Sequence, residues 1–136
     1  MNDTIKILEK DYNYLCNLIK NEKGSNTIEA GNIAYLGSEI KRAERIKDQT
    51  DDFDFVTMNS LVEFTDIQSN KKMKVKLVQP SEANFRNGTV SIFSMLGSAL
   101  LGYQKGSEVV YHAPAGERKI RIDHITYPDE DISIVR

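Results

Sequence analysis

Apolar residues recur with helical spacing through the first third of the chain. They are separated by three and four residues in turn, first at Ile5, Leu8, Tyr12, Leu15 and Ile19, then at Ile33, Leu36, Ile40 and Ala43. A polar stretch at residues 21–26 interrupts the pattern. Two such segments joined by a short polar loop predict an antiparallel helical hairpin over residues 1–50, in effect a short coiled coil.

Capping residues and glycines set the expected ends of these helices. Asn2 or Asp3 can cap the first helix, and Asn26 can cap the second. Gly31 and Gly37 each disfavour the helix by about 1 kcal/mol relative to Ala. We therefore expect the second helix to begin late or to bend. Arms of roughly 16 residues would be about 25 Å long at the rise of an α-helix.

The chain changes character after residue 50. Residues 47–55, "KDQTDDFDF", are acidic and predict a hinge. From residue 53 onward, alternating runs bounded by turn residues predict strands over 61–65, 72–79, 89–93, 108–113 and 118–127. Residues 53–136 are therefore expected to form a second domain, with residues 128–136 as a loosely held tail.

Two of the predicted strands carry further information. In the second, Met73, Val75 and Leu77 face the core, while Lys72, Lys74 and Lys76 alternate with them and face outward. In the last, the apolar alternation slips by one residue, and a bulge at Asp123 or His124 would restore it.

Residues 91–102, "SIFSMLGSALLG", begin as a strand and continue as a helix. Leu96, Ala99 and Leu100 fall on one side of that helix, and Gly102 is suited to end it. The predicted fold class is α+β: a helical hairpin, followed by a mostly antiparallel sheet with one short helix packed on it.

Composition narrows the possible functions. The chain has 136 residues, a net charge of −2, one Cys and no Trp. This charge does not indicate a nucleic-acid or membrane partner. A single Cys, Cys16, excludes an intramolecular disulfide and a Cys-based zinc site, and we interpret it as a small residue beside the helix seam. The polar N-terminus and the lack of an apolar run of about 20 residues indicate a cytoplasmic protein.

Catalytic and cofactor motifs are missing from the sequence. There is no phosphate-binding glycine loop and no nucleophile elbow. His112 and His124 lie in adjacent predicted strands and could approach each other, but we favour their interpretation as half-exposed strand residues. The carboxylates of residues 51–54 are interpreted as a solvated hinge. We expect no catalytic residue, metal or cofactor.

The lysine stripe, Lys72, Lys74 and Lys76, has two interpretations. It can be a solvated face that guards an edge strand. Alternatively, it can meet an acidic partner surface or phosphates. The aromatic residues lack the spacing of a stacking platform, so we expect no direct sequence-specific contact with nucleic acid.

Residues 90–127, "VSIFSMLGSALLGYQKGSEVVYHAPAGERKIRIDHITY", resemble the C-terminal domain of the Gre-type transcript-cleavage factors of bacterial RNA polymerase. Residues 54–66, "DFVTMNSLVEFTD", resemble one branch of that family, the Rnk-type regulators of nucleoside diphosphate kinase. The resemblance implies an FKBP-like C-terminal domain that binds RNA polymerase near its secondary channel.

Gre factors use a long coiled coil whose acidic tip helps hold a catalytic magnesium ion, and hard carboxylate ligands suit that role. Here the expected tip carries Glu22 and Glu29 without an Asp, and the arm is short. The resemblance therefore implies a non-enzymatic regulator that occupies the polymerase and competes with longer factors by mass action.

The strand-to-helix corner is the candidate docking surface, through Ser94, Met95, Leu96 and Gly97. Met95 stands where the family often has Pro. Alternatively, Leu96 belongs to the core and Ser94 is a helix cap. Two other functions remain open. One is an interaction or dimerisation module that uses Tyr14, Leu18 or Tyr35 off the helix seam. The other is a peptidyl-prolyl isomerase, which the lack of Trp disfavours.

Overall fold

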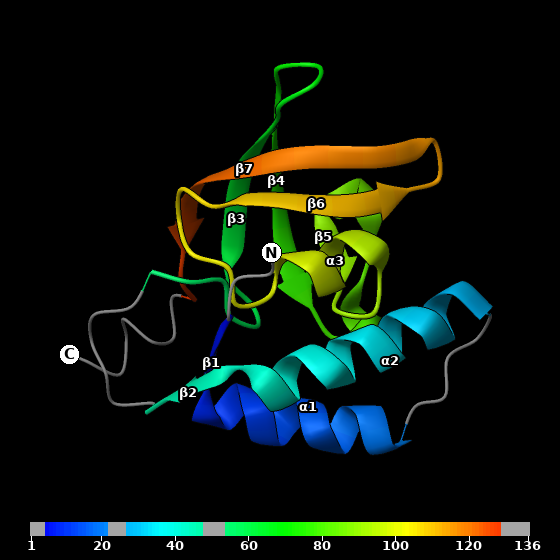
Figure 1. Ribbon diagram of the computed structural model, residues 1–136, viewed down its shortest axis with the longest axis vertical. Helices are drawn as coiled ribbons and strands as arrows, with labels where there is room; N and C mark the ends of the chain where they lie inside the picture. Colours follow the sequence, from blue (N-terminus) through cyan, green and yellow to red (C-terminus); the bar gives the residue numbers. More distant parts are fainter. Residues whose placement is uncertain (1–4, 22–26, 48–53, 129–136) are drawn as a thin grey trace.

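A curled five-stranded sheet forms the centre of the computed structural model, which describes residues 5–21, 27–47 and 54–128 (Figure 1). The strand order is β5-β4-β3-β7-β6. Neighbouring strands are antiparallel except β4 and β5, which are parallel. The strands are β3 (Leu61–Asp66), β4 (Lys71–Val78), β5 (Thr89–Ser91), β6 (Glu108–Ala113) and β7 (Gly116–Thr126). The α+β class and the mostly antiparallel sheet are confirmed.

Alternation along β4 is as the sequence predicts. Val75 and Leu77 are buried, Met73 is partly buried, and the three lysines between and beside them are exposed. The register of β7 against β3 shifts at one point, where Glu63 pairs with His124 and Phe64 pairs with Ile122. Asp123 is therefore the extra residue of a β-bulge, which confirms the predicted repair of the apolar pattern.

The turn between β3 and β4 is built around the buried Asp66. Its Oδ1 accepts the main-chain N–H groups of Gln68 and Ser69 at 3.1 and 3.2 Å. Its Oδ2 accepts hydrogen bonds from Nε and Nη2 of Arg118 at 2.9 and 2.7 Å. The hydrogen bonds from Arg118 are the main cause that lowers the pKa of this carboxyl group. The tip of the hairpin is thereby tied to β7.

The short helix α3 (Met95–Leu100) packs on the inner face of the sheet. Two 3₁₀ turns, η1 (Pro80–Glu82) and η2 (Phe85–Asn87), connect β4 to β5. The core combines apolar residues of α3, the sheet and the N-terminal helices, among them Leu100, Leu77, Ile120, Leu15 and Leu36, all fully buried. One continuous core therefore joins the N-terminal and C-terminal parts.

The N-terminal part contains two short strands that the sequence pattern did not predict. The elements are β1 (Lys6–Leu8), α1 (Glu9–Asn21), α2 (Thr27–Arg42) and β2 (Glu44–Ile46), with β1 and β2 parallel. The expectation that the first helix includes Ile5 and Leu8 is wrong. Glu44 N–H donates to Ile5 O at 2.9 Å, and this pairing holds the segment extended. The proposed caps Asn2, Asp3 and Asn26 lie outside the described residues.

The second helix does not start late, which corrects that part of our expectation. It is continuous from Thr27 to Arg42, with Leu36 and Ile40 buried on its predicted apolar side. At Gly37 an added Cβ would lie 4.0 Å from Ile19 Cδ1, which is an ordinary contact. Packing of the buried side therefore overrides the low helix propensity of the two glycines.

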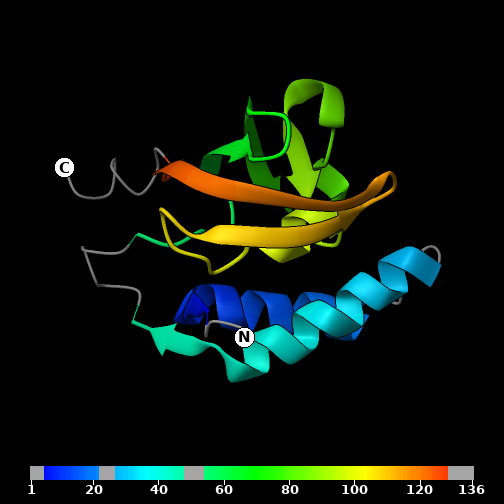
Figure 2. The same ribbon diagram turned by 45° about the horizontal axis from the view of Figure 1, so that its top comes forward.

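Helices α1 and α2 run antiparallel along one side of the molecule, beneath the sheet (Figures 1 and 2). They do not extend away from the sheet domain, because α2 contacts α3 and both helices contribute to the core. Of the predicted hinge 47–55, residues 48–53 lie outside the described residues. Phe55, at its end, is buried, and its carbonyl accepts the Tyr127 hydroxyl at 2.8 Å.

Gly102 joins the two parts of the molecule. Its φ is +86°, and an added Cβ would lie 2.6 Å from Ile5 Cβ and 2.8 Å from Lys6 O. Lys6 N–H donates to Gly102 O at 3.1 Å, and Gly102 N–H donates to Val56 O at 3.0 Å. A side chain at this position would separate β1 from the segment that follows α3.

We predict that Gly102→Ala lowers the free energy of unfolding by about 2–4 kcal/mol, since the new Cβ adds overpacking to an unfavourable φ. Gly106→Ala is the matched control, because its φ is also positive, +90°, but an added Cβ meets nothing within 4 Å. That control should cost about 1 kcal/mol. Denaturant unfolding measures both, and equal losses would contradict the account of the junction.

Candidate functional site

Three serines build the corner between β5 and α3. Ser91 Oγ accepts Phe93 N–H at 2.9 Å. Ser94 Oγ donates to Ser91 O at 2.7 Å and accepts Gly97 N–H at 2.9 Å, so Ser94 is the N-cap of α3. Ser98 Oγ donates back to Ser94 O at 2.8 Å. The first turn of the helix is therefore fixed by side-chain hydrogen bonds, as a short helix requires.

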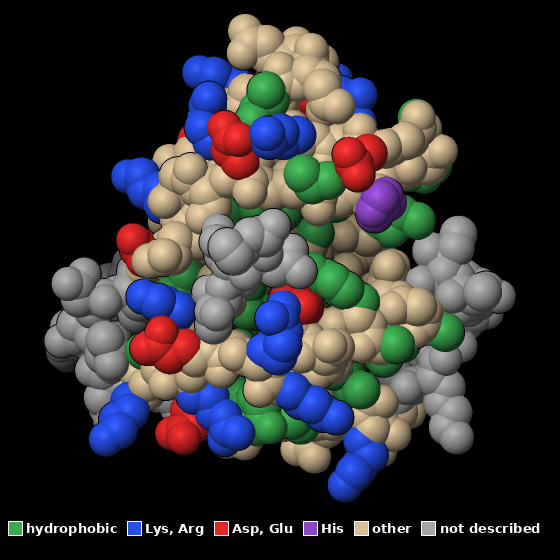
Figure 3. All heavy atoms as spheres, viewed as in Figure 1, with side chains coloured by type: hydrophobic (Ala, Val, Ile, Leu, Met, Phe, Trp, Pro, Cys, Tyr) green, Lys and Arg blue, Asp and Glu red, His purple; other side chains and the backbone are tan. Residues whose placement is uncertain are grey.

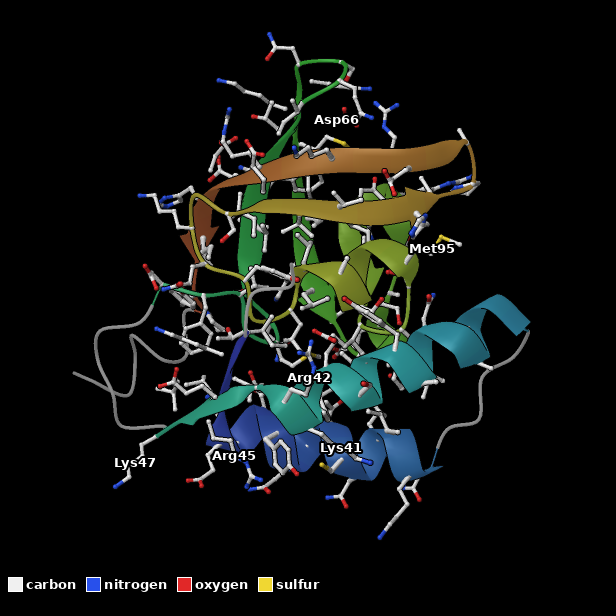
Figure 4. The ribbon with its side chains drawn as sticks, viewed as in Figure 1. Lys41, Arg42, Arg45, Lys47, Asp66 and Met95 are labelled. Carbon is white, nitrogen blue, oxygen red and sulfur yellow. The ribbon has the colours of Figure 1, made fainter. Side chains whose placement is uncertain are left out.

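Gly97 is buried and packs within the chain. An added Cβ would lie 2.0 Å from Ser91 O and 3.0 Å from Leu77 Cδ1, so α3 can approach β4 and β5 because this residue has no side chain. Leu96 packs partly buried against the core. Met95 is partly exposed and lies at the outer side of the corner (Figure 4). Of the four predicted corner residues, Met95 offers the most accessible apolar side chain.

Helix α2 reaches the same corner. Asn32 Nδ2 donates to the main-chain carbonyl of Phe93 at 3.0 Å, although the two residues are 61 positions apart in the chain. The helical periodicity gave no signal for this contact, because Asn32 lies between the apolar positions of the seam. The contact fixes the helix pair relative to the candidate docking corner.

The lysine stripe lies on the other face of the sheet. Leu77 points to Gly97 of α3, and its neighbours in β4 point the opposite way because side chains alternate along a strand. The partners of these lysines in β3 lie on the same outer face: Thr65 is opposite Lys72, Glu63 is opposite Lys74, and Leu61 is opposite Lys76. The structure therefore does not combine the corner and the lysines in a single site.

Part of the stripe stands at a sheet edge. Strand β5 pairs with β4 at residues 76–78, so within the described chain Lys72 and Lys74 have no strand beyond them. This placement fits the edge-guarding interpretation of the stripe. It also leaves both ammonium groups accessible to an acidic surface.

A polar cleft of about 610 Å³ lies between α1 and the end of β4. Asp11 Oδ2 accepts Met58 N–H at 3.1 Å, and the Tyr14 hydroxyl donates to Gln79 Oε1 at 2.6 Å. Burial, and then the charge of Glu82, raise the pKa of Tyr14. These hydrogen bonds attach α1 to the sheet domain, which is the structural role that we assign to the cleft.

The two histidines do not meet. His112 pairs with Glu117, whereas His124 pairs with Glu63, and residues 117 and 124 lie about 23 Å apart along β7 at 3.3 Å per residue. The approach that the sequence left open does not occur, and both histidines are exposed strand residues. Among the residues that the structure describes, no three His, Cys, Asp or Glu side chains gather as metal ligands. Cys16 is exposed on α1.

A basic cluster at the end of the helix pair was missed by the sequence analysis. It comprises Lys41 and Arg42 at the end of α2, Arg45 of β2, and Lys47, which directly follows β2 (Figures 3 and 4). Glu39 accepts Arg42 Nη2 at 2.7 Å, and the Arg45 guanidinium lies 3.9 Å from the centre of the Tyr12 ring. Cations in the last turn of a helix also complement its dipole, which explains part of the cluster.

Comparison with known proteins identifies the family. Residues 49–127 match the family model described as "Transcription elongation factor, GreA/GreB, C-term". The transcription elongation factor GreA of Nautilia profundicola is 33% identical over 97 residues, which is 71% of this chain and 60% of that protein. The GreA of Nitratidesulfovibrio vulgaris (strain DSM 19637 / Miyazaki F) is 30% identical over 95 residues, 70% of this chain and 59% of that protein.

A solved structure agrees with these matches. The prokaryotic transcription elongation factor GreA/GreB from Nitrosomonas europaea superposes with a TM-score of 0.74 at 29% identity, covering 93% of this chain and all of that chain. The chain belongs to the GreA/GreB transcription elongation factor family. It spans about three fifths of the length of the curated relatives that it matches. Within the described residues, no helix is long and apolar enough to cross a membrane.

We predict that Ser94→Ala lowers the free energy of unfolding by about 1 kcal/mol, because α3 loses its N-cap. Met95→Ala should cost less than about 1 kcal/mol, since this side chain is partly exposed. Thermal or denaturant unfolding compares the two variants. A larger loss for Met95→Ala than for Ser94→Ala would mean that Met95 is a core residue and not a surface contact.

Proposed function

We propose that this protein is a non-enzymatic regulator that binds bacterial RNA polymerase near its secondary channel and competes there with longer GreA/GreB factors. The observation that carries the proposal is the family match over residues 49–127, which includes the candidate corner and all five strands of the main sheet. A protein that shares a docking domain with longer relatives can exclude them by mass action alone.

The dimensions of the helix pair support occupancy without transcript cleavage. Helices α1 and α2 have 13 and 16 residues, or about 20 and 24 Å at 1.5 Å per residue. Glu29 lies in the first turn of α2, and Glu22 lies outside the described residues. Delivery of carboxylates to a magnesium ion inside another enzyme requires both reach and ligands. The proposed role requires neither.

Finer assignments follow from the resemblance of residues 54–66 and 90–127. We place the chain in the Rnk-type branch, whose name refers to regulation of nucleoside diphosphate kinase, and we assign an FKBP-like architecture to residues 53–136. Residues 1–50 are proposed to act as a short coiled-coil hairpin in the bound state. The site of action is the cytoplasm, where RNA polymerase works.

The proposed contact is divided between two groups of residues. Met95 and Leu96 supply apolar contact at the corner, while Ser94 and Gly97 hold the corner in shape through the bonds and close packing described above. The stripe Lys72, Lys74 and Lys76 faces away from the corner. It would therefore meet a separate, acidic part of the partner.

A general interaction module is the second candidate function. Tyr35 is 47% exposed on α2 and Tyr14 is 37% exposed on α1, and exposed aromatic residues off the helix seam favour such a role. The Tyr14 hydroxyl is engaged by Gln79, so Tyr35 is the stronger anchor of the two.

We predict that core RNA polymerase captures the purified protein and that a full-length GreA factor displaces it in proportion to its concentration. Met95→Asp should weaken capture at least about tenfold, because a carboxylate would be buried at the contact. A failure to bind polymerase at micromolar concentrations would refute the proposal. Binding that GreA cannot displace would indicate a different docking site.

The lysine stripe is tested in the same capture experiment. Changing Lys72, Lys74 and Lys76 together to Glu should weaken binding and reduce its sensitivity to salt. The matched control changes Lys20, Arg86 and Lys105 to Glu, which alters the net charge equally at exposed positions outside the candidate sites. Equal effects of the two triple variants would assign the loss to overall charge and not to the stripe.

A further inference from the structure

Strand β6 is the last strand at one end of the sheet, and its only partner in the described chain is β7 (Figure 1). The register pairs Glu108 with Arg121, Val110 with Lys119 and His112 with Glu117. An edge strand presents main-chain donors and acceptors that another strand can use. Which residues present them follows from the hydrogen bonds of the ladder.

The outward-facing groups belong to alternate residues. Ile122 N–H donates to Ser107 O at 3.0 Å, so Ser107 and Ile122 form a hydrogen-bonded pair. In an antiparallel ladder such pairs alternate with non-bonded pairs. The main-chain groups of Val109, Tyr111 and Ala113 therefore point to β7, and those of Glu108, Val110 and His112 point away. Within the described chain, these last groups have no hydrogen-bond partner.

The two edges of the sheet differ in how well they are protected against pairing with another strand. At the β4/β5 end, β5 has three residues, Asn84 bridges to Thr89 beyond it, and Lys72 and Lys74 guard the rest of β4. At the other end, β6 has six residues with no lysine, proline or bulge among them. Val110 in its middle is 49% exposed. One edge is protected against strand pairing, and the other is suited to it.

The sequence of β6 is complementary to itself when the strand is reversed. In "EVVYH", residues 108–112, a two-fold axis at Val110 would place Glu108 opposite His112 of the second copy. It would also place Val109 opposite Tyr111, and Val110 opposite Val110. These are an acid–imidazole pair, a β-branched–aromatic pair and an apolar pair, all of which favour antiparallel pairing.

We propose that the β6 edge binds a second copy of this chain, so that two main sheets join into one continuous antiparallel sheet about a two-fold axis at Val110. Glu108, Val110 and His112 would each exchange main-chain hydrogen bonds with the partner strand. Contact between identical surfaces is the simplest closed assembly. The proposal does not depend on polymerase binding, since the edge lies outside the corner and the lysine stripe.

Position-specific disulfide formation tests the proposed register. The experiment places Val110→Cys in a Cys16→Ser background, which removes the native thiol. At the two-fold axis, opposed Cα atoms of a hydrogen-bonded pair lie about 5.5 Å apart, within the range of a disulfide. His112→Cys in the same background is the matched control, because residue 112 opposes residue 108 and not itself.

Mild oxidation should give a covalent dimer of the full chain at position 110 and little or none at position 112. Equal cross-linking at both positions, or none at Val110, would overturn the proposal. Circular dichroism of both reduced variants shows whether the fold is kept. The charge variants below give a second readout that needs no cysteine.

Sedimentation over a concentration series tests the side-chain pairing. The unmodified chain should associate reversibly to a dimer. His112→Glu should weaken that association several-fold or more, because it opposes Glu108 with a second carboxylate twice in each dimer. Adding Glu108→His to His112→Glu restores the opposite pairing and should recover the dimer. A chain that stays monomeric throughout, or a dimer indifferent to His112→Glu, would overturn the proposal.

Discussion

The main-chain pairing of Lys6 with Gly102 is the contact on which the arrangement of this molecule depends. It brings the first strand against the segment that follows α3, and Gly102 allows this approach because a Cβ would overlap Ile5 and Lys6. β2 then pairs with β1, and the helices between these two strands must lie alongside the sheet domain. Two short strands thus determine where some thirty helical residues are placed.

This junction gives the helix pair a fixed relation to the candidate docking corner. Asn32 of α2 donates a hydrogen bond to the Phe93 carbonyl, and Asp11 of α1 accepts one from the N–H group of Met58. The helices therefore act as part of one body with the domain that matches the GreA/GreB family. In the proposed function, docking of the corner would position the helix pair at the same time, while its length limits how far it enters the polymerase.

Local patterns predicted the features that depend on neighbouring residues. The alternation of β4, the bulge at Asp123 and the cap at Ser94 all follow from side-chain chemistry within a few positions. The pattern gave a wrong prediction where pairing with a distant segment determines the local structure. Ile5 and Leu8 have helical spacing, but Leu8 lies in β1 and Ile5 directly precedes it. It could not show that α3 and the lysine stripe lie on opposite faces of the sheet, because that placement depends on the packing of Gly97 against Ser91.

Transcript cleavage in stalled RNA polymerase complexes tests most directly whether the protein occupies the polymerase without acting in its active centre. The account predicts that the purified protein leaves the RNA at full length, and that rising amounts of it slow the cleavage stimulated by a full-length GreA factor. Shortening of the RNA by this protein alone, abolished by Glu29→Ala, would contradict the account.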